Sequence, residues 1–285
     1  MSKCWCGSGL EYNICHKDFD KKIKKAKKQG YMIPPKKIIK NAEKIEKMKK
    51  AAVVNNGMLD YIEEHIKAGM STEDIDDMCV KYLKEHGGRS ADLGYQGYPK
   101  SVCTSVNDVV CHGVPSKEVI LKEGDIVNVD ATTEVNGYYA DASRMFMIGK
   151  VNDNAKRLVE VTKECLEVGM AAVKPWESTV NDIGKAIEKH AHANGYSVVE
   201  EFCGHGIGKS MHEDPYVFHY DADERSYLLV PGMCFTIEPM INEGARQIFI
   251  DSKDNWTVYT EDRKLSAQWE HTLVVTEEGV EIISK

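Results

Sequence analysis

Residues 124–148 read GDIVNVDATTEVNGYYADASRMFMI, and this stretch decides the fold of the chain. Residues 125–135 and 138–148 each alternate between polar and apolar side chains, which is typical of β-strands. Asn136-Gly137 between them is the strongest short hairpin motif, because these residues accept the positive φ angles of a tight turn. The stretch therefore predicts an antiparallel hairpin.

The two-residue turn also determines which side chains of the two strands face each other. It places Thr132 opposite Asp141, so Asp130 and Asp141 are diagonal neighbours on one face, roughly 7 Å apart. Carboxylates are costly in apolar strands unless cations compensate their charge. This spacing suits two metal ions about 3.5–4 Å apart that share a bridging carboxylate.

Three later residues in strand-like or glycine-flanked segments complete a candidate ligand set, namely His205, Glu238 and Glu270. One imidazole and four carboxylates form an oxygen-rich site that favours Mn, Fe, Co or Zn over copper. A water between two such cations becomes acidic enough to attack a carbonyl, so we expect a metal-dependent hydrolase. The chain has no G-x-S-x-G, Walker or H-E-x-x-H motif, which leaves serine hydrolases, P-loop nucleotide binding and zincins without support.

The second half of the chain repeats the landmarks of the first half in the same order. A long helix predicted from residue 36 to Gly69 precedes a helix capped by Ser71-Thr72. A helix over 153–172 likewise precedes a helix that begins after Ser178-Thr179. The order predicts an internal duplication.

The duplicated landmarks include residues with catalytic chemistry. Each half has a histidine three residues before a proline, His112 and His212, and a glycine six residues before a strand carboxylate, Asp130 and Glu238. We expect an α+β fold of two pseudo-symmetric halves, in which helix pairs cover antiparallel strands. His112 and His212 would then face each other beside the carboxylates.

Composition and charge place the chain among globular proteins. Hydrophobic residues make up 42% and charged residues 29% of its 285 residues, and no apolar run reaches the length of a membrane span. The first residues lack the apolar region of a signal peptide, so we expect a cytoplasmic protein without membrane contact. The nine cysteines show no regular disulfide pattern and are expected to be reduced thiols.

The N-terminus carries a separate cluster of metal-binding residues. Cys4, Cys6, Cys15 and His16 place four soft ligands within thirteen residues. A segment this short has no core of its own, so a tetrahedral structural zinc could order it. Residues 4–16 resemble the SEC-C type of zinc motif, which implies a docking module, since four protein ligands leave no position for water.

A strongly basic segment follows this cluster. Residues 17–50 contain fourteen lysines and four acidic residues, although the whole chain has a net charge of −8. Such a basic arm on an acidic body indicates an anionic partner such as nucleic acid, and the alternative is a solvated linker and helix.

Five motifs connect the chain to a known family: GYQGYPKSVCTSVNDVVCHGVP, GDIVNVDATTEVNGYYADASRMF, GHGIGKSMHEDP, PGMCFTIEP and SAQWEHT. In this order, over residues 42–285, the chain resembles the type I methionine aminopeptidases. The 26 positions from His212 to Glu238 leave no room for the helical insertion of the type II enzymes. The resemblance implies the pita-bread fold. Together with the N-terminal cluster and the basic segment, it divides the chain into a zinc motif (1–20), a basic linker arm (21–41) and a catalytic domain (42–285).

The resemblance also implies a role for each site residue. The ligands of two divalent metal ions would be Asp130, Asp141, His205, Glu238 and Glu270, with Asp141 and Glu270 bridging. Glu238 would relay the proton of the attacking water. His112 would contact the scissile amide nitrogen, and His212 the substrate backbone or the tetrahedral intermediate.

The substrate pocket and a third cation site follow from the same resemblance. The methionine pocket would include Tyr95, Tyr98, Cys103, Met211 and Trp256, whose aromatic and polarizable walls suit a thioether; plain core packing is the alternative for Tyr98 and Met211. A Na or K ion would lie at Asn107, Val109 and Ser266. Gln96, Ala140 and Ala142 depart from the residues of many relatives, but none of these departures removes a ligand.

The expected function is removal of the initiator methionine from nascent polypeptides when the second residue is small. We expect the protein to be a monomer, and we expect its zinc motif and lysine arm to bring it to the ribosome. A tight site beside the metals would exclude larger second side chains. One alternative is a prolidase-like enzyme of the same fold, which the Tyr95 and Cys103 region disfavours. A pita-bread protein without catalysis is another, and retention of all five ligands argues against it.

Overall fold

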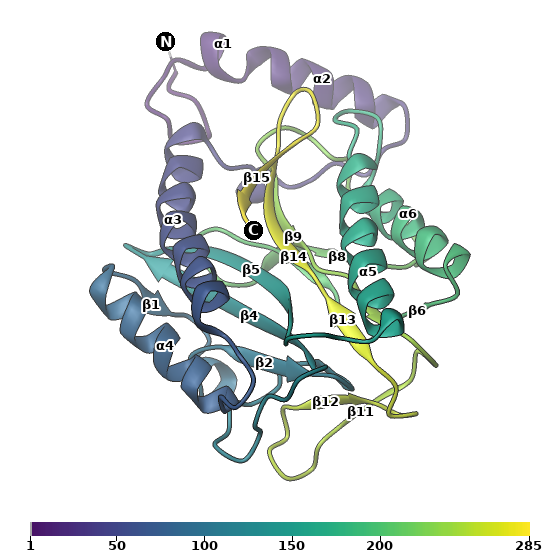
Figure 1. Ribbon diagram of the computed structural model, residues 1–285. Coiled ribbons are helices and arrows are strands. Elements are labelled where there is room, and N and C mark those ends of the chain that lie inside the picture. The colour runs from purple at the N-terminus through teal and green to yellow at the C-terminus, as the bar shows by residue number, and fades with distance from the viewer. Residues whose placement is uncertain (1) are drawn as a thin grey trace.

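The computed structural model describes residues 2–285 as a curved antiparallel sheet with helices packed along it (Figure 1). The helices are α1 (Tyr12–Cys15), α2 (Lys17–Lys28), α3 (Ala42–His65), α4 (Thr72–Glu85), α5 (Asp153–Ala171) and α6 (Val180–Ala193), with 3-10 turns η1 (Lys36–Ile38) and η2 (Tyr95–Gly97). The strands are β1 (Arg89–Ser90), β2 (Cys103–Val106), β3 (Val109–Cys111), β4 (Ile126–Val135), β5 (Tyr138–Met147), β6 (Ser197–Val198), β7 (Gly204–Gly206), β8 (Glu213–Val217), β9 (Cys234–Ile237), β10 (Met240–Asn242), β11 (Ile248–Ile250), β12 (Val258–Thr260), β13 (Ser266–Gln268), β14 (Glu270–Val275) and β15 (Val280–Ser284).

The hairpin of β4 and β5 has the expected turn and register. Asn136 and Gly137 take φ angles of 52° and 78°, in the left-handed region that the tight turn requires. Thr132 lies opposite Asp141. Asp130 and Asp141 are therefore on one face of the ribbon, as the sequence predicts.

Strand β14 joins the two halves of the main sheet. The strand order is β1-β4-β5-β14-β9-β7-β8, so β14 lies between β5 of the first half and β9 of the second half. Ser143 on β5 pairs with Asp130 on one side and with Glu270 on the other. Because directly paired residues share a face of the sheet, Asp130 and Glu270 flank Ser143 on the same side.

The second helix of each half begins with the same capping motif. At α4, the Ser71 amide donates to Asp74 Oδ2 at 2.7 Å, and at α6 the Thr179 amide donates to Asp182 Oδ2 at 2.7 Å. Each of these pairs forms a capping box. Each cap residue also forms an isolated bridge to a later segment, Ser71 with Ile120 and Thr179 with Leu228. These repeated contacts agree with the duplication read from the sequence.

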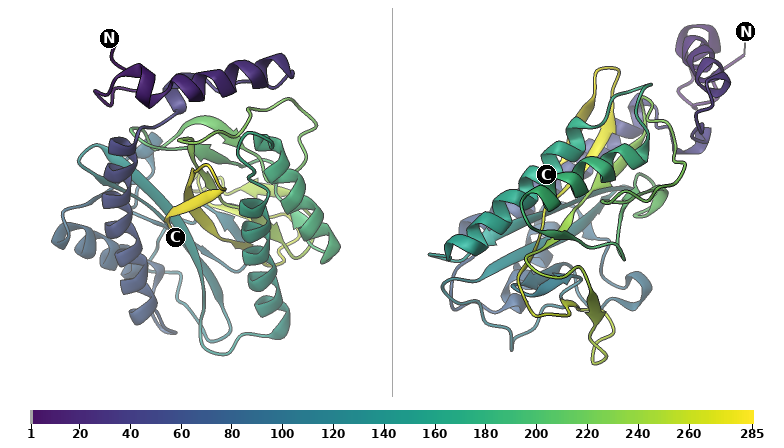
Figure 2. Two further views of the ribbon diagram at one scale, coloured as in Figure 1. Left: turned by 90° about the horizontal axis from the view of Figure 1, so that it is seen from above. Right: turned by 90° about the vertical axis from the view of Figure 1, so that its right-hand side faces the viewer.

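Helix pairs cover the two halves of the sheet separately (Figures 1 and 2). Leu59 of α3 and Ile75 of α4 belong to the apolar cluster that includes Val129 of β4. The largest cluster contains residues of α5 and α6 together with Phe235 of β9, which is fully buried. The chain thus has the α+β pita-bread fold that the sequence predicts.

The prediction that helix α3 begins at residue 36 was wrong, whereas its C-terminal end at His65 lies shortly before Gly69. Helix α3 begins at Ala42, where the Asn41 side chain caps it by accepting from the Lys44 amide at 3.0 Å. Before this cap, η1 is a separate turn and Ile39 forms a bridge with Met233. Contacts with the body therefore override the helical periodicity of these residues.

The N-terminal segment is folded against the body (Figure 2). Helix α2 crosses residue 20, the expected end of the zinc motif. Phe19 makes an edge contact with Trp176 at 5.1 Å between ring centroids, and Lys22 pairs with Glu277 at 2.8 Å. Within residues 2–285, no helix is both long enough and apolar enough to cross a membrane.

Candidate metal centre

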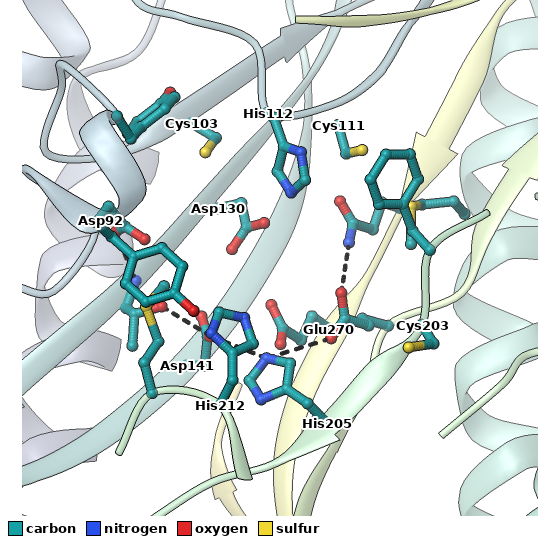
Figure 3. A pocket seen from close by; sticks show the side chains of 18 of the residues that line it. Asp92, Cys103, Cys111, His112, Asp130, Asp141, Cys203, His205, His212 and Glu270 are labelled. Atoms are coloured by element: carbon teal, nitrogen blue, oxygen red, sulfur yellow. Dashed lines mark hydrogen bonds and ion pairs between the residues drawn. The ribbon is translucent and has the colours of Figure 1, made fainter. Parts of the chain in front are cut away.

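A cavity of about 430 Å³ opens on the face of the sheet that carries the hairpin aspartates. Its lining includes all five ligand-type residues expected from the sequence: Asp130, Asp141, His205, Glu238 and Glu270. Figure 3 shows the labelled members of this set directed toward one another from different strands. Residues more than a hundred positions apart therefore meet at one point.

Asp141, His205 and Glu270 form the most compact part of this group. Each offers a ligand atom, and these atoms lie within 4.8 Å of one another. The His205 Nε2 atom is 3.7 Å from Asp141 Oδ2 and 3.7 Å from Glu238 Oε1. The imidazole thus faces two carboxylates from different halves of the sheet.

The His205 ring is oriented for metal binding through Nε2. Its Nδ1 lies 3.1 Å from the Gly206 carbonyl oxygen, which can only accept, so Nδ1 carries the proton and Nε2 has a free lone pair. Burial lowers the pKa of His205 to about 4, which keeps the ring neutral near pH 7.

Neighbouring side chains hold the remaining ligands in place. The Thr132 hydroxyl donates to Asp141 Oδ2 at 2.8 Å, and the Thr236 hydroxyl donates to Glu238 Oε1 at 2.7 Å. The Gln268 amide lies 3.4 Å from the other oxygen of Glu238. Such contacts fix carboxylate orientation around metal sites.

The charges of the cluster are not compensated by the chain itself. Burial, reinforced by neighbouring carboxylates, raises the pKa of Asp130, Glu238 and Glu270 well above the ordinary value. Asp141 Oδ1 is buried and has no hydrogen-bond partner among the described residues. Divalent cations fit this donor set, because they supply the missing positive charge and a partner for the free oxygen.

His112 and His212 lie on the rim of the same cavity. The His212 ring is 4.1 Å from that of His205 between centroids. His112 has a φ angle of 55°, an uncommon conformation for a non-glycine residue that is concentrated at functional sites. Burial lowers the pKa of both histidines to about 4, so each is a neutral imidazole with one donor near pH 7.

Aromatic and sulfur-containing side chains line the rest of the cavity, and they include the five pocket residues expected from the sequence: Tyr95, Tyr98, Cys103, Met211 and Trp256. Tyr98 and Trp256 meet edge to face at 5.1 Å between centroids. Tyr95 approaches His212 at 5.1 Å. The structure therefore places these residues within one cavity with the ligand cluster.

Some residues of the site were missed by the sequence analysis. Asp92 is buried in the cavity wall, where its Oδ2 accepts from the Thr132 amide at 3.0 Å. His219 is fully buried, and its Nε2 accepts from the Glu238 amide at 3.1 Å. Neither residue follows a strand register that sequence periodicity reveals, so only the fold places them.

The residues expected to bind a monovalent cation are close to one another. The Ser266 amide donates to the Asn107 carbonyl oxygen at 2.9 Å. Asn107 has a φ angle of 55°, and Val109 begins β3 two residues later.

The four N-terminal ligand-type residues also converge. The His16 Nδ1 atom lies 3.2 Å from Cys4 Sγ and 3.1 Å from Cys15 Sγ, and Cys6 Sγ is 3.6 Å from Cys15 Sγ. Two sulfurs on one tetrahedral zinc at 2.3 Å are about 3.8 Å apart. The spacing of these ligand atoms fits a tetrahedral zinc ion.

The fold and the ligand cluster define a metal-dependent hydrolase. A family model for metallopeptidase family M24 matches residues 46–277. The chain therefore belongs to metallopeptidase family M24. Membership of this family implies that the site binds divalent metal ions.

Similar proteins share most of their length with this chain. It is 49% identical over 247 residues to the methionine aminopeptidase of Escherichia coli (strain K12), covering 86% of this chain and 93% of that protein. The crystal structure of methionine aminopeptidase from Rickettsia prowazekii has a TM-score of 0.84 and 41% identity, covering 89% and 100%. Prolidase from Pyrococcus furiosus has a TM-score of 0.70 and 22% identity, covering 87% and 65%, which shows a shared fold alone.

Proposed function

We propose that the protein removes the N-terminal methionine from new polypeptides when the second residue is small. The convergence of five ligand-type residues with His112 and His212 around one cavity carries this proposal. The 49% identity to the methionine aminopeptidase of Escherichia coli supports methionine as the residue removed.

The reaction needs two divalent cations, which Asp130, Asp141, His205, Glu238 and Glu270 would hold. When bound, the cations lower the pKa of a water and polarise the carbonyl of the first peptide bond. Glu238 accepts the proton of the attacking water and delivers it to the leaving amine. The Thr236 hydroxyl at 2.7 Å keeps one Glu238 oxygen directed for this transfer.

His112 and His212 position the substrate. As neutral imidazoles they can each donate one hydrogen bond, His112 near the scissile amide nitrogen and His212 near the oxygen that gains charge. Tyr95, Tyr98, Cys103, Met211 and Trp256 surround the first side chain with aromatic and sulfur groups, which suit a thioether. Limited space beside the metals restricts the second residue to small side chains.

Hydrolysis of Met-Ala-Ser by metal-free protein reconstituted with Co, Mn, Fe or Zn, one at a time, tests this function. We expect turnover only with added cation, and metal analysis of protein purified without supplements identifies the physiological ion. Ala-Pro-Ala is the matched control for a prolidase, and its preferred cleavage would overturn the assignment.

Two further ions complete the proposed inventory. A structural zinc would bind Cys4, Cys6, Cys15 and His16, in the SEC-C manner. A Na or K ion would use Asn107, Val109 and Ser266. We retain the division into a zinc motif (1–20), a basic arm (21–41) and a catalytic domain (42–285).

We also propose that the cytoplasmic monomer approaches the ribosome through its N-terminal arm. On α2, Lys24, Lys25, Lys27 and Lys28 are exposed, and none of them forms an ion pair within residues 2–285. This lysine group suits phosphate contacts, which salt weakens.

Ribosome co-sedimentation tests this role. Replacing the four lysines by alanine should abolish salt-sensitive binding and leave Met-Ala-Ser turnover intact. A deletion through residue 40 is less suitable, because Ile38 and Ile39 are buried in the body. Co-sedimentation unchanged by the four substitutions would contradict the proposal.

A further inference from the structure

A second cavity of about 460 Å³ adjoins the metal centre. Its lining consists of Lys37, Ile38, His212, Glu213, Asp214 and Tyr216. His212 and Tyr216 line both cavities, so the two cavities adjoin at these side chains. Lys37 and Ile38 belong to η1, before α3. Part of the wall of the second cavity therefore comes from residues 2–41, which we call the N-terminal extension.

Tyr216 lies where the two cavities meet. In the pairing of β7 with β8 it is directly opposite His205, and directly paired residues share a face of the sheet. Its side chain therefore lies on the same face as the metal-centre histidine, yet 66% of Tyr216 is exposed. Packing of the core does not account for so exposed an aromatic ring at this position.

Two ion pairs attach the extension to β8 at this cavity. Lys40 Nζ lies 2.6 Å from Glu213 Oε2, and the Lys40 side chain is only 5% exposed. Lys37 Nζ lies 2.9 Å from Asp214 Oδ2, with both side chains largely in solvent. The buried pair fixes the wall, while the outer pair presents one donor and one acceptor group to the cavity.

Strand β8 also ends the order of the main sheet. Among the described residues no strand pairs with its outer edge. A polypeptide whose first residue occupies the metal centre can reach the second cavity past the shared residues His212 and Tyr216.

We propose that this second cavity binds the residues of the substrate that follow the third, counted from its N-terminus. The inference rests on the proposed function, because it assigns the downstream part of the same polypeptide. Tyr216 packs on a downstream side chain, and the Lys37–Asp214 pair hydrogen-bonds the peptide backbone. The extension thereby becomes part of the substrate site.

A comparison of peptide lengths tests the subsite. The values of kcat/KM are measured for Met-Ala-Ser and for a six-residue peptide that begins with the same three residues. We expect the ratio of the longer to the shorter peptide to be about five in the wild-type enzyme, the size of one aromatic contact. Tyr216→Ala should bring this ratio close to one, and Lys37→Ala should lower it.

The turnover of Met-Ala-Ser by each variant reports whether that variant is folded. Because the ratio is taken within one protein, differences in the amount of active enzyme cancel. Lys189→Ala, which changes an exposed lysine on α6, is the matched control and should keep the wild-type ratio. A wild-type ratio of one, or a full ratio retained in the folded variants, overturns the subsite. Wild-type protein that cleaves neither peptide with any cation contradicts the proposed function instead.

Discussion

Buried carboxylates are the residues on which this molecule's chemistry depends. Asp130, Glu238 and Glu270 are held beside one another away from solvent, and their pKa values are raised by burial and mutual repulsion. The fold alone does not stabilise such a group of charges. Bound cations convert this unfavourable arrangement into a metal centre.

Because we propose that Glu238 acts both as a metal ligand and as a proton carrier, we expect Glu238→Ala to lose both functions. Turnover of Met-Ala-Ser should fall by about 10³-fold or more, the contribution of a general base. The measurement uses purified variant reconstituted with metal and quantified for bound cation. Glu261→Ala, at an exposed glutamate, is the control. Near-normal turnover of metal-replete Glu238→Ala would refute the role.

Asp92 acts on the metal centre through an intermediate residue. It accepts from the Thr132 amide at 3.0 Å, while the Thr132 hydroxyl donates to Asp141 Oδ2 at 2.8 Å. We expect Asp92→Ala to weaken metal binding about ten-fold or more, as loss of an outer contact does.

Titration calorimetry with Mn and Co on metal-free protein measures this effect. Asp92→Asn keeps an acceptor for the Thr132 amide and should bind metal more tightly than Asp92→Ala. Equal affinities in wild type and Asp92→Ala would show that the contact does not position Asp141.

At the scale of elements, the sequence predicted an element correctly where contacts between residues close in the chain determine that element. The hairpin required only Asn136-Gly137 and strand alternation, and the helix starts at Ser71 and Thr179 required only nearby carboxylates. The helix expected from residue 36 did not form there, because Ile39 forms an isolated bridge with Met233, a residue far away in the sequence. Periodicity carries no information about such a contact.

The N-terminal element is expected to depend on zinc. The Cys6 carbonyl oxygen accepts from the Asn41 side chain at 2.9 Å, which connects the cluster to the start of α3. Cys15→Ser should release one zinc per chain and increase amide hydrogen exchange in residues 4–16, with turnover of Met-Ala-Ser retained. Cys203→Ser, outside this cluster, is the control for zinc content. Unchanged zinc content in Cys15→Ser would contradict the site.

At the scale of the whole molecule, the carboxylate cluster links stability to pH. A carboxyl group whose pKa is raised by folding stabilises the protein at low pH, and this contribution is lost as pH rises. Burial lowers the pKa of the buried histidines from 6.5, so their contribution makes stability increase as pH rises toward 6.5. Above that pH they contribute no further change. Above pH 6.5, therefore, ionisation of the buried carboxyl groups determines how stability changes with pH.

We expect the Tm of metal-free protein to fall between about pH 6.5 and 8, the range above the ordinary histidine pKa. Bound cations compensate the ionised carboxylates, so the metal-loaded protein should change less. Calorimetric scans of both forms in matched buffers measure the difference. A metal-free Tm that is constant or rises over this range would contradict the expected linkage.

The sequence by itself determined the hairpin register and the duplication, because these depend on local turn chemistry, strand periodicity and motif spacing. Through its resemblance to a known family, it also supplied the candidate ligand residues. The ligands Asp130 and Asp141 could be related to each other because one short turn joins their strands. Glu270 could be placed beside Asp130 only once β14 was seen to pair with β5.

Only the tertiary structure decided where the extension lies and which buried groups support the site. Asp92, His219 and the Lys40–Glu213 pair depend on contacts between segments far apart in the chain. Such contacts are selected by packing and by the need to pair buried polar groups, and neither leaves a periodic pattern. Thus the sequence determined the chemistry of the metal centre, whereas packing decided how its substrate path is built.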